Sequence, residues 1–73
     1  MVEIATRLKS LRTERGFTQK VVAEGMGIKE RHYQFYEHGD KKPGCEKLVA
    51  MADFFDVSTD YLLGRTNDPR MYR

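Results

Sequence analysis

The 73-residue chain has the composition of a small globular domain, with 40% hydrophobic and 33% charged residues. A disordered chain would hold fewer Leu, Ile, Val and Phe, and a chain this short has room for one core without a second, sensing domain. No apolar run approaches the ~18 residues that a membrane-spanning helix needs. Cys45 is the only cysteine and no secretion signal opens the sequence, so we expect a protein of the reducing cytoplasm.

The formal net charge of +2 is unevenly distributed along the chain. Residues 1–42 hold nine Lys and Arg against six Asp and Glu, a balance of +3, whereas residues 43–73 hold four against five, a balance of −1. The first part is therefore the better candidate for contact with a polyanion. Solvated helix faces produce similar imbalances, so the charge pattern needs support from motifs.

The first two predicted helices are short and amphipathic. Apolar residues at helical spacing predict a first helix that ends near Gly16, and its stripe consists of Ile4, Leu8 and Leu11. Thr18 then offers a hydroxyl that can cap a second helix. Gly27 suits the end of that helix, because glycine adopts the left-handed conformation without steric cost.

A third helix is predicted over residues 29–38, because Tyr33 and Tyr36 lie three residues apart and Gly39 follows them. Two short helices joined by a glycine turn form a helix-turn-helix. Residues 40–44 read as a polar loop. A fourth helix then carries the apolar residues Leu48, Met51, Ala52 and Phe55, and a short fifth helix carries Tyr61, Leu62 and Leu63, with Ser58 as its cap and Gly64 as its end.

We therefore predict an all-α fold with one domain over residues 1–64 and a short, flexible C-terminal tail over residues 65–73. An ordinary pair of helices within a helical core is the competing interpretation of residues 18–39. Against it stand a small residue, a turn glycine and apolar anchors at the positions that a DNA-reading motif requires. These residues are Val22, Ala23, Met26, Gly27, Ile28, Tyr33 and Tyr36.

The chain resembles the Cro/repressor-like helix-turn-helix family, also called the XRE type, over nearly its whole length. The resemblance runs through RLKSLRTERGFTQ, TQKVVAEGMGIKERHYQFYEHG and KKPGCEKLVAMADFFDVSTDYLLG. It implies a compact, five-helix, lambda-repressor-like DNA-binding domain, in which the third helix lies in the major groove and two copies bind a palindromic operator. It also implies an internal ion pair between Arg12 and Glu37.

The predicted recognition helix turns four residues away from its buried tyrosines, namely Glu30, Arg31, Gln34 and Phe35. Arg31 can pair bidentately with guanine and Gln34 with adenine. Gln19 and Lys20 lie on the first turn of the second helix, where side-chain donors and free backbone N–H groups suit a phosphate oxygen. After the recognition helix come His38, Lys41 and Lys42, which we expect near the DNA backbone or the minor groove.

Three residues each keep two interpretations. Glu30 either accepts a hydrogen bond from cytosine N4 or complements the helix macrodipole. Phe35 departs from the polar residue usual in the family, and it either touches a thymine methyl group or packs sideways near the fourth helix. Lys29 replaces the usual Ser or Thr cap, so either the cap is weak or Lys29 binds phosphate, which is the interpretation we favour.

The sequence contains no pattern typical of an enzyme. His32 and His38 have no Cys or carboxylate set at metal-ligand spacing, and Cys45 has no partner for thiol chemistry. No nucleophile–base pair or phosphate-binding glycine loop is present either. We expect no catalysis, no metal and no cofactor.

Two functional hypotheses follow. The leading one is a bacterial or phage transcriptional regulator, a repressor in the first instance, that binds double-stranded operator DNA. It would act as a weak homodimer strengthened on DNA, with Tyr61, Leu62 and Leu63 as the contact. The alternative is an antitoxin or anti-regulator whose main partner is a protein, because the same fold can serve either role. With no sensing domain, any inducer would act through a protein antagonist or by competition for sites.

Overall fold

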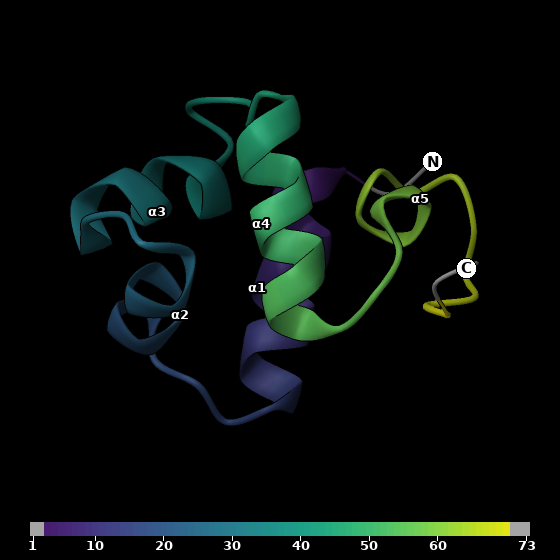
Figure 1. Cartoon of the computed structure of the whole chain (residues 1–73), viewed down its shortest axis with the longest axis horizontal. Helices are drawn as coiled ribbons and strands as arrows, with labels where there is room; N and C mark the ends of the chain where they lie inside the picture. The colour runs from purple at the N-terminus through teal and green to yellow at the C-terminus, as the bar shows by residue number, and fades with distance from the viewer. Residues whose placement is uncertain (1–2, 71–73) are drawn as a thin grey trace.

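A computed structural model describes residues 3–70, and within that range it contains five helices and no strand. In the order of the chain (Figure 1) the helices are α1 (Ile4–Glu14), α2 (Gln19–Met26), α3 (Glu30–His38), α4 (Cys45–Phe55) and α5 (Thr59–Leu62). The all-α fold of five helices predicted from the sequence is confirmed.

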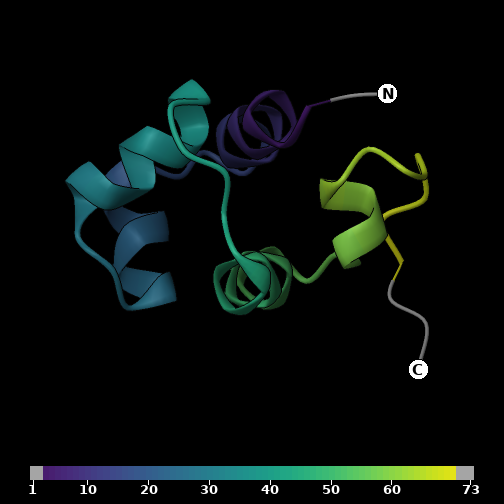
Figure 2. The same ribbon diagram turned by 90° about the horizontal axis from the view of Figure 1, so that it is seen from above.

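The helix-turn-helix pair α2 and α3 occupies one end of the molecule, as Figures 1 and 2 both show. The longer helices α1 and α4 fill the middle, and α5 lies at the opposite end. The molecule extends over 29 × 23 × 21 Å. The pair α2–α3 thus presents its outer surface to solvent, and its inner surface packs on α1 and α4.

A single apolar core joins all five helices. Its fully buried members include Leu8 of α1, Val22 of α2, Tyr33 of α3, Phe55 of α4 and Leu62 of α5. Burying one such side chain contributes about 1.5–3 kcal/mol. The position of α3 is therefore fixed by contacts across the whole fold rather than by its own nine residues.

Local chemistry sets the turn between α2 and α3. The Thr18 hydroxyl accepts a hydrogen bond from the backbone N–H of Val21 at 3.1 Å, as expected for a helix cap. Gly27 ends α2 at a φ of 75°, where a residue with a Cβ would be strained, and the N–H of Ile28 donates to the Ala23 carbonyl at 3.0 Å. The third helix, α3, then begins at Glu30.

Gly25 permits the close approach of α2 to α4. A Cβ added at Gly25 would overlap the ring of Phe54. That ring also packs edge-on against Phe17, with 5.5 Å between the ring centroids. The sequence pattern does not single out Gly25, because its contact depends on how two separate helices meet.

The described part of the C-terminal tail packs on the domain instead of projecting from it. The Ser58 N–H donates to the Pro69 carbonyl at 2.8 Å, the Arg65 N–H donates to the Asp60 carbonyl at 2.9 Å, and an Arg7 amino group lies 3.4 Å from the Asn67 side-chain oxygen. These hydrogen bonds connect residues 65–70 to α1, to α5 and to the cap of α5, and the flexibility expected from residue 65 onward stays a prediction. The rest of the predicted tail, residues 71–73, lies outside the described residues.

The predicted dimer contact requires one correction. Leu62 is fully buried in the core, so it cannot offer a surface to a second copy in this fold. A four-residue helix turns once, and Leu62 is the residue that this turn points inward. Tyr61 and Leu63 stay partly exposed on either side of it.

Candidate nucleic-acid interface

The outer face of α3 carries the residues predicted to read DNA. Tyr33 and Tyr36 are buried, whereas Glu30 and Arg31 are exposed, and Gln34 and Phe35 are partly exposed. This division follows from the helical repeat, which places residues three and four apart on one side. Within residues 3–70 the Arg31 guanidinium makes no hydrogen bond or ion pair, so its N–H groups are available.

Arg12 and Glu37, the expected ion pair, join α1 to α3. The Arg12 Nε donates to Glu37 Oε2 and Arg12 Nη2 donates to Oε1, each at 2.8 Å, and Arg12 Nη1 donates to the Phe17 carbonyl at 3.0 Å. Two parallel bonds of this kind are the strong, planar arrangement that guanidinium and carboxylate favour. The pair therefore holds the recognition helix in a fixed orientation on the rest of the domain.

The ion pair also determines the protonation of its members. The Glu37 side chain is only 2% exposed and that of Arg12 is 16% exposed. Burial is the largest single influence and would raise the pKa of Glu37, but the hydrogen bonds to its carboxylate and the charge of Arg12 together outweigh it, so the pKa of Glu37 is lowered. Burial first, and the neighbouring Glu37 second, raise the pKa of Tyr33, which remains a neutral core residue.

A chain of amide hydrogen bonds extends from this pair to the reading face. Gln19 Nε2 donates to Glu37 Oε1 at 3.3 Å, and Gln34 Nε2 donates to Gln19 Oε1 at 3.2 Å. The sequence predicts Gln34 as an adenine reader and Gln19 as a phosphate contact. One N–H of the Gln34 amide is thus engaged, while within residues 3–70 its second N–H and its oxygen make no hydrogen bond and are the two groups that pairing with adenine needs.

The first turn of α3 has no side-chain cap. Lys29 occupies the cap position, makes no capping hydrogen bond and has an exposed side chain, which leaves its predicted binding of phosphate a prediction. Glu30 follows in the first turn, where its charge complements the helix macrodipole. The side chains of Lys29 and Glu30 are both exposed to solvent.

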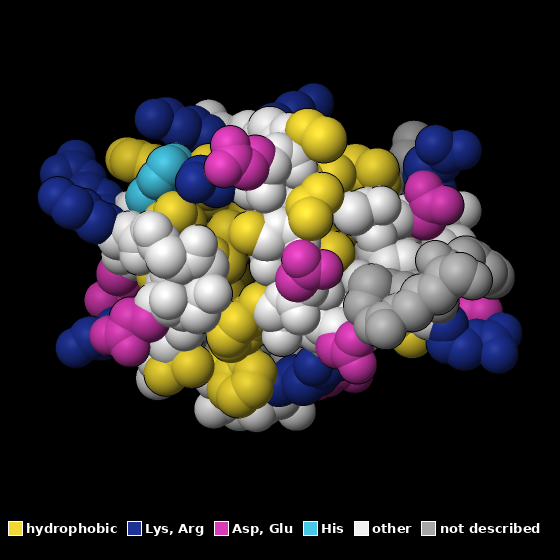
Figure 3. Space-filling view, viewed as in Figure 1, with side chains coloured by type: hydrophobic (Ala, Val, Ile, Leu, Met, Phe, Trp, Pro, Cys, Tyr) yellow, Lys and Arg dark blue, Asp and Glu magenta, His cyan; other side chains and the backbone are white. Residues whose placement is uncertain are grey.

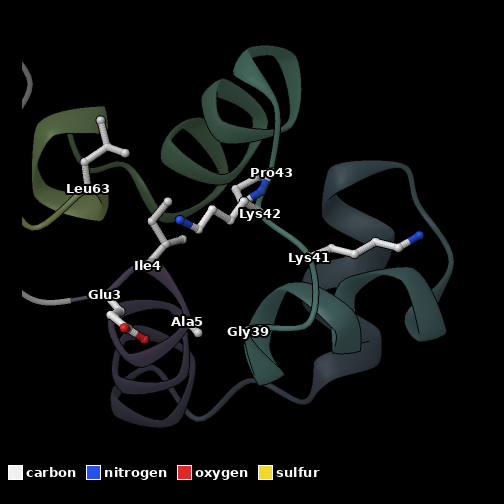
Figure 4. Close-up of a pocket in the computed structure, with 8 residues that line it drawn as sticks. All are labelled: Glu3, Ile4, Ala5, Gly39, Lys41, Lys42, Pro43 and Leu63. Carbon is white, nitrogen blue, oxygen red and sulfur yellow. The ribbon is translucent and has the colours of Figure 1, made fainter.

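Basic side chains gather where α3 lies, as the dark blue groups at that end of Figure 3 show. Besides Arg31, the exposed cations near α2 and α3 are Lys20, Lys29, Lys41 and Lys42. His38, at the end of α3, is also exposed. Lys41 and Lys42 separate in space, because Lys42 extends toward Ile4 across a pocket while Lys41 extends to the opposite side (Figure 4).

Phe35 lies between Arg31, a candidate for contact with a base, and Lys41, a candidate for contact with the DNA backbone. The centroid of its ring lies 5.8 Å from the Arg31 guanidinium carbon and 5.1 Å from the Lys41 amino nitrogen. Phe35 is partly exposed and does not belong to the core cluster or to the apolar residues packed against it. The interpretation that Phe35 packs sideways toward α4 thus gains no support from the core contacts.

Comparison with known proteins identifies this arrangement. A sequence model described as helix-turn-helix matches residues 8–62. This chain belongs to the XRE-type helix-turn-helix family. Members of the family with similar sequences include the HTH-type transcriptional regulator YobD of Bacillus subtilis, 46% identical over 63 residues, which cover 86% of this chain and 56% of YobD. The cryptic phage CTXphi transcriptional repressor RstR of Vibrio cholerae is 38% identical over 64 residues, which cover 88% of this chain and 57% of RstR.

The fold of this helix-turn-helix protein matches solved repressor structures. A crystal structure of the P22 c2 repressor with a synthetic operator aligns with a TM-score of 0.81 at 22% identity, over 86% of this chain and 96% of the other. At that identity the match establishes the fold, and it confirms the predicted lambda-repressor-like arrangement. The chain spans a little over half the length of the curated relatives it matches.

Two arginines of this helix-turn-helix domain have structural roles that the sequence pattern does not indicate. Arg7 is 9% exposed and its guanidinium carbon lies 4.0 Å from the centre of the Tyr61 ring. Arg15 donates to the carbonyl of Phe55, the last residue of α4, at 2.7 Å. In the sequence both resemble solvated helix residues. The charge of Arg15 complements the C-terminal end of α4. The sequence cannot indicate this role, because it does not show that the end of α4 lies beside Arg15.

The described residues offer neither a metal centre nor a membrane span. Among residues 3–70, no group of three or more His, Cys, Asp or Glu side chains is arranged to hold a metal ion. In the same part of the chain, every helix is too short or too polar to cross a bilayer.

Proposed function

We propose that this protein is a sequence-specific transcriptional regulator that represses by occupying double-stranded operator DNA. The observation that carries the proposal is the outer face of α3, where among the described residues Arg31 makes no hydrogen bond or ion pair and the ion pair of Arg12 with Glu37 fixes the helix. The nature of the relatives, a transcriptional regulator and a phage repressor, supports it. Such a protein binds without catalysis and acts where bacterial or phage DNA is transcribed, in the cytoplasm.

The proposed base contacts come from the exposed part of α3. Arg31 donates two parallel hydrogen bonds to O6 and N7 of a guanine, which is the commonest specific contact in the major groove. Gln34 reads an adenine through its oxygen and the N–H that is not bonded to Gln19. Glu30 belongs over a cytosine amino group, because its charge would be repelled by phosphate.

The proposed phosphate contacts surround α3. Gln19 and Lys20 place side-chain donors beside the first N–H groups of α2, and Thr18 already satisfies a third N–H of that turn. Lys29 and Lys41 extend the positive surface along α3 and the loop after it. Other members of the set are Lys42 and His38. These contacts supply general affinity, since phosphates are the same in every sequence.

We propose that two copies bind a palindromic operator. Half-sites on one face of DNA lie ~34 Å apart, so each α3 must lie ~17 Å from the two-fold axis, and a 29 Å molecule can meet that requirement. The contact would use Tyr61 and Leu63 at the end remote from α3. Leu63, Ile4 and Pro43 also line an open pocket of about 450 Å³ that reaches from α5 to Gly39 at the end of α3, and they provide apolar surface beside α5 (Figure 4). With so few contact residues, against ~20–30 on each side of a standard interface, we expect a weak dimer that DNA strengthens.

Selection of bound sequences from random duplexes tests the proposal. We expect one enriched motif with two-fold symmetry, bound more tightly than a scrambled duplex of the same composition. Inserting five base pairs between the half-sites should abolish tight binding, because it rotates one half-site to the other face of the DNA. Survival of full affinity would exclude the dimer, and failure to enrich any motif would favour the antitoxin or anti-regulator hypothesis.

A further inference from the structure

Phe35 is the only large apolar side chain on the outer face of α3, and the proposed base and phosphate contacts do not require it. It lies outside the core, so folding does not explain its position on the exposed side of the recognition helix. A single apolar side chain on a surface is common in itself, so the role of Phe35 has to be inferred from the groups around it.

The ring of Phe35 forms one cluster with two cations. Arg31 and Lys41 both approach it within 6 Å, which is the range of an effective cation–π contact. Arg31 is four residues before Phe35 on the same face, and Lys41 comes from the loop after α3. Within residues 3–70 neither cation has a carboxylate partner. The cluster therefore orients a free guanidinium and an apolar ring toward the same region of space.

Base edges offer such a pair of groups only a small choice of partners. The guanidinium matches O6 and N7 of guanine. A phenyl ring has no hydrogen-bonding group, and the only apolar feature on a base edge in the major groove is the 5-methyl group of thymine, which 5-methylcytosine also carries. The guanidinium carbon and the ring are 5.8 Å apart, less than two base-pair steps of ~3.4 Å each.

We infer that Arg31 and Phe35 form one reading unit for a guanine and a 5-methylpyrimidine that lie within two base pairs of each other. The inference rests on the proposed function and adds a specificity residue to it. Phe35 selects the methyl group, whether thymine or 5-methylcytosine carries it. The amino group of Lys41 contacts the Phe35 ring and restrains its orientation. Methylation of a cytosine at that position would then strengthen binding.

Base analogues test this inference on the motif obtained by selection. Replacing the thymine by uracil, in one half-site, removes only the methyl group, and burial of one such group corresponds to about a fourfold loss of affinity. In a duplex with cytosine at that position, 5-methylcytosine should restore about the same factor. Phe35→Ala should bind thymine and uracil duplexes equally, whereas Phe35→Leu, which keeps an apolar contact, should retain part of the preference.

The controls separate this inference from the proposed function. Thermal unfolding of Phe35→Ala should match that of the wild type within a few degrees, because Phe35 is outside the core. An Arg31→Ala selection should lose its guanine preference within two base pairs of the methyl-sensitive position. An enriched motif whose affinity is insensitive to every thymine-to-uracil change, or a uracil penalty that persists in Phe35→Ala, would overturn the inference alone. Failure to enrich any motif would remove the proposed function and this inference together.

Discussion

The ion pair between Arg12 and Glu37 allows a quantitative prediction. Glu37→Gln keeps the shape of the side chain but removes its charge, and leaves the Arg12 guanidinium, 16% exposed, without its carboxylate. Removing one partner of a fully buried pair costs about 3–5 kcal/mol. Because Arg12 keeps some access to water, we expect Glu37→Gln to lower the free energy of unfolding by about 2–4 kcal/mol. For a domain of this size the thermal midpoint should fall by about 10–25 °C.

Chemical unfolding followed by circular dichroism measures this effect, and a double variant tests its cause. Arg12→Met combined with Glu37→Leu should recover most of the lost stability, since the double variant leaves no buried charge unpaired. The exposed pair of Arg65 with Asp60, whose charged atoms are 3.8 Å apart, supplies the matched control. Arg65→Gln should cost less than about 1 kcal/mol. An equal cost for Arg65→Gln and Glu37→Gln would refute the structural role assigned to the buried pair.

The same pair predicts a pH dependence with a definite sign. The pKa of Glu37 is lower in the folded protein than in the unfolded chain. Its contribution is therefore fully present above the unfolded pKa of about 4.3 and is lost as pH falls through the lowered folded value. The stability difference between the wild type and Glu37→Gln should be constant above about pH 5.5 and shrink below about pH 4. A difference that grows on acidification would contradict this assignment.

Three further predictions concern the helix cap, the α2–α4 contact and the phosphate contacts. Thr18→Ala should lower the free energy of unfolding by about 1 kcal/mol, whereas Thr18→Ser should be nearly neutral, as measured by urea unfolding. Gly25→Ala should destabilise the protein by about 1–3 kcal/mol, although alanine favours helix, and Phe54→Leu should relieve much of that loss in the double variant. Lys20→Gln and Lys41→Gln should weaken binding to cognate and scrambled duplexes alike, and each should reduce the slope of log affinity against log salt by ~1 for every phosphate that the variant no longer neutralises.

Sequence patterns predict the helices because their signals are local. Thr18 and Ser58 are followed by helices whose first turns they cap, and Gly27 and Gly39 end helices at positive φ. Each of these positions depends on the conformation of three or four neighbouring residues. The all-α fold with a helix-turn-helix can therefore be predicted before any tertiary contact is known.

The features that cannot be predicted in this way depend on how separate helices meet. The overlap that a side chain at Gly25 would have with Phe54 requires the distance between α2 and α4. An apolar residue near the end of a chain, such as Leu62, can face a partner or the core, and only packing decides between them. The bond between Gln19 and Gln34 likewise requires the crossing of α2 and α3. Sequence spacing puts Gln34 on the reading face but cannot show that its amide is already engaged.

The central claim is that the outer face of α3 reads DNA sequence, and the affinity ratio of cognate to scrambled duplex measures it most directly. Fluorescence titrations of the wild type and Arg31→Ala on both duplexes, at several salt concentrations, give that ratio. We predict that Arg31→Ala binds the cognate duplex more weakly by about 1–3 kcal/mol and loses its preference at one base position, while the scrambled duplex loses far less. An unchanged ratio in a fully folded Arg31→Ala would contradict the account and leave a protein partner as the better explanation of this surface.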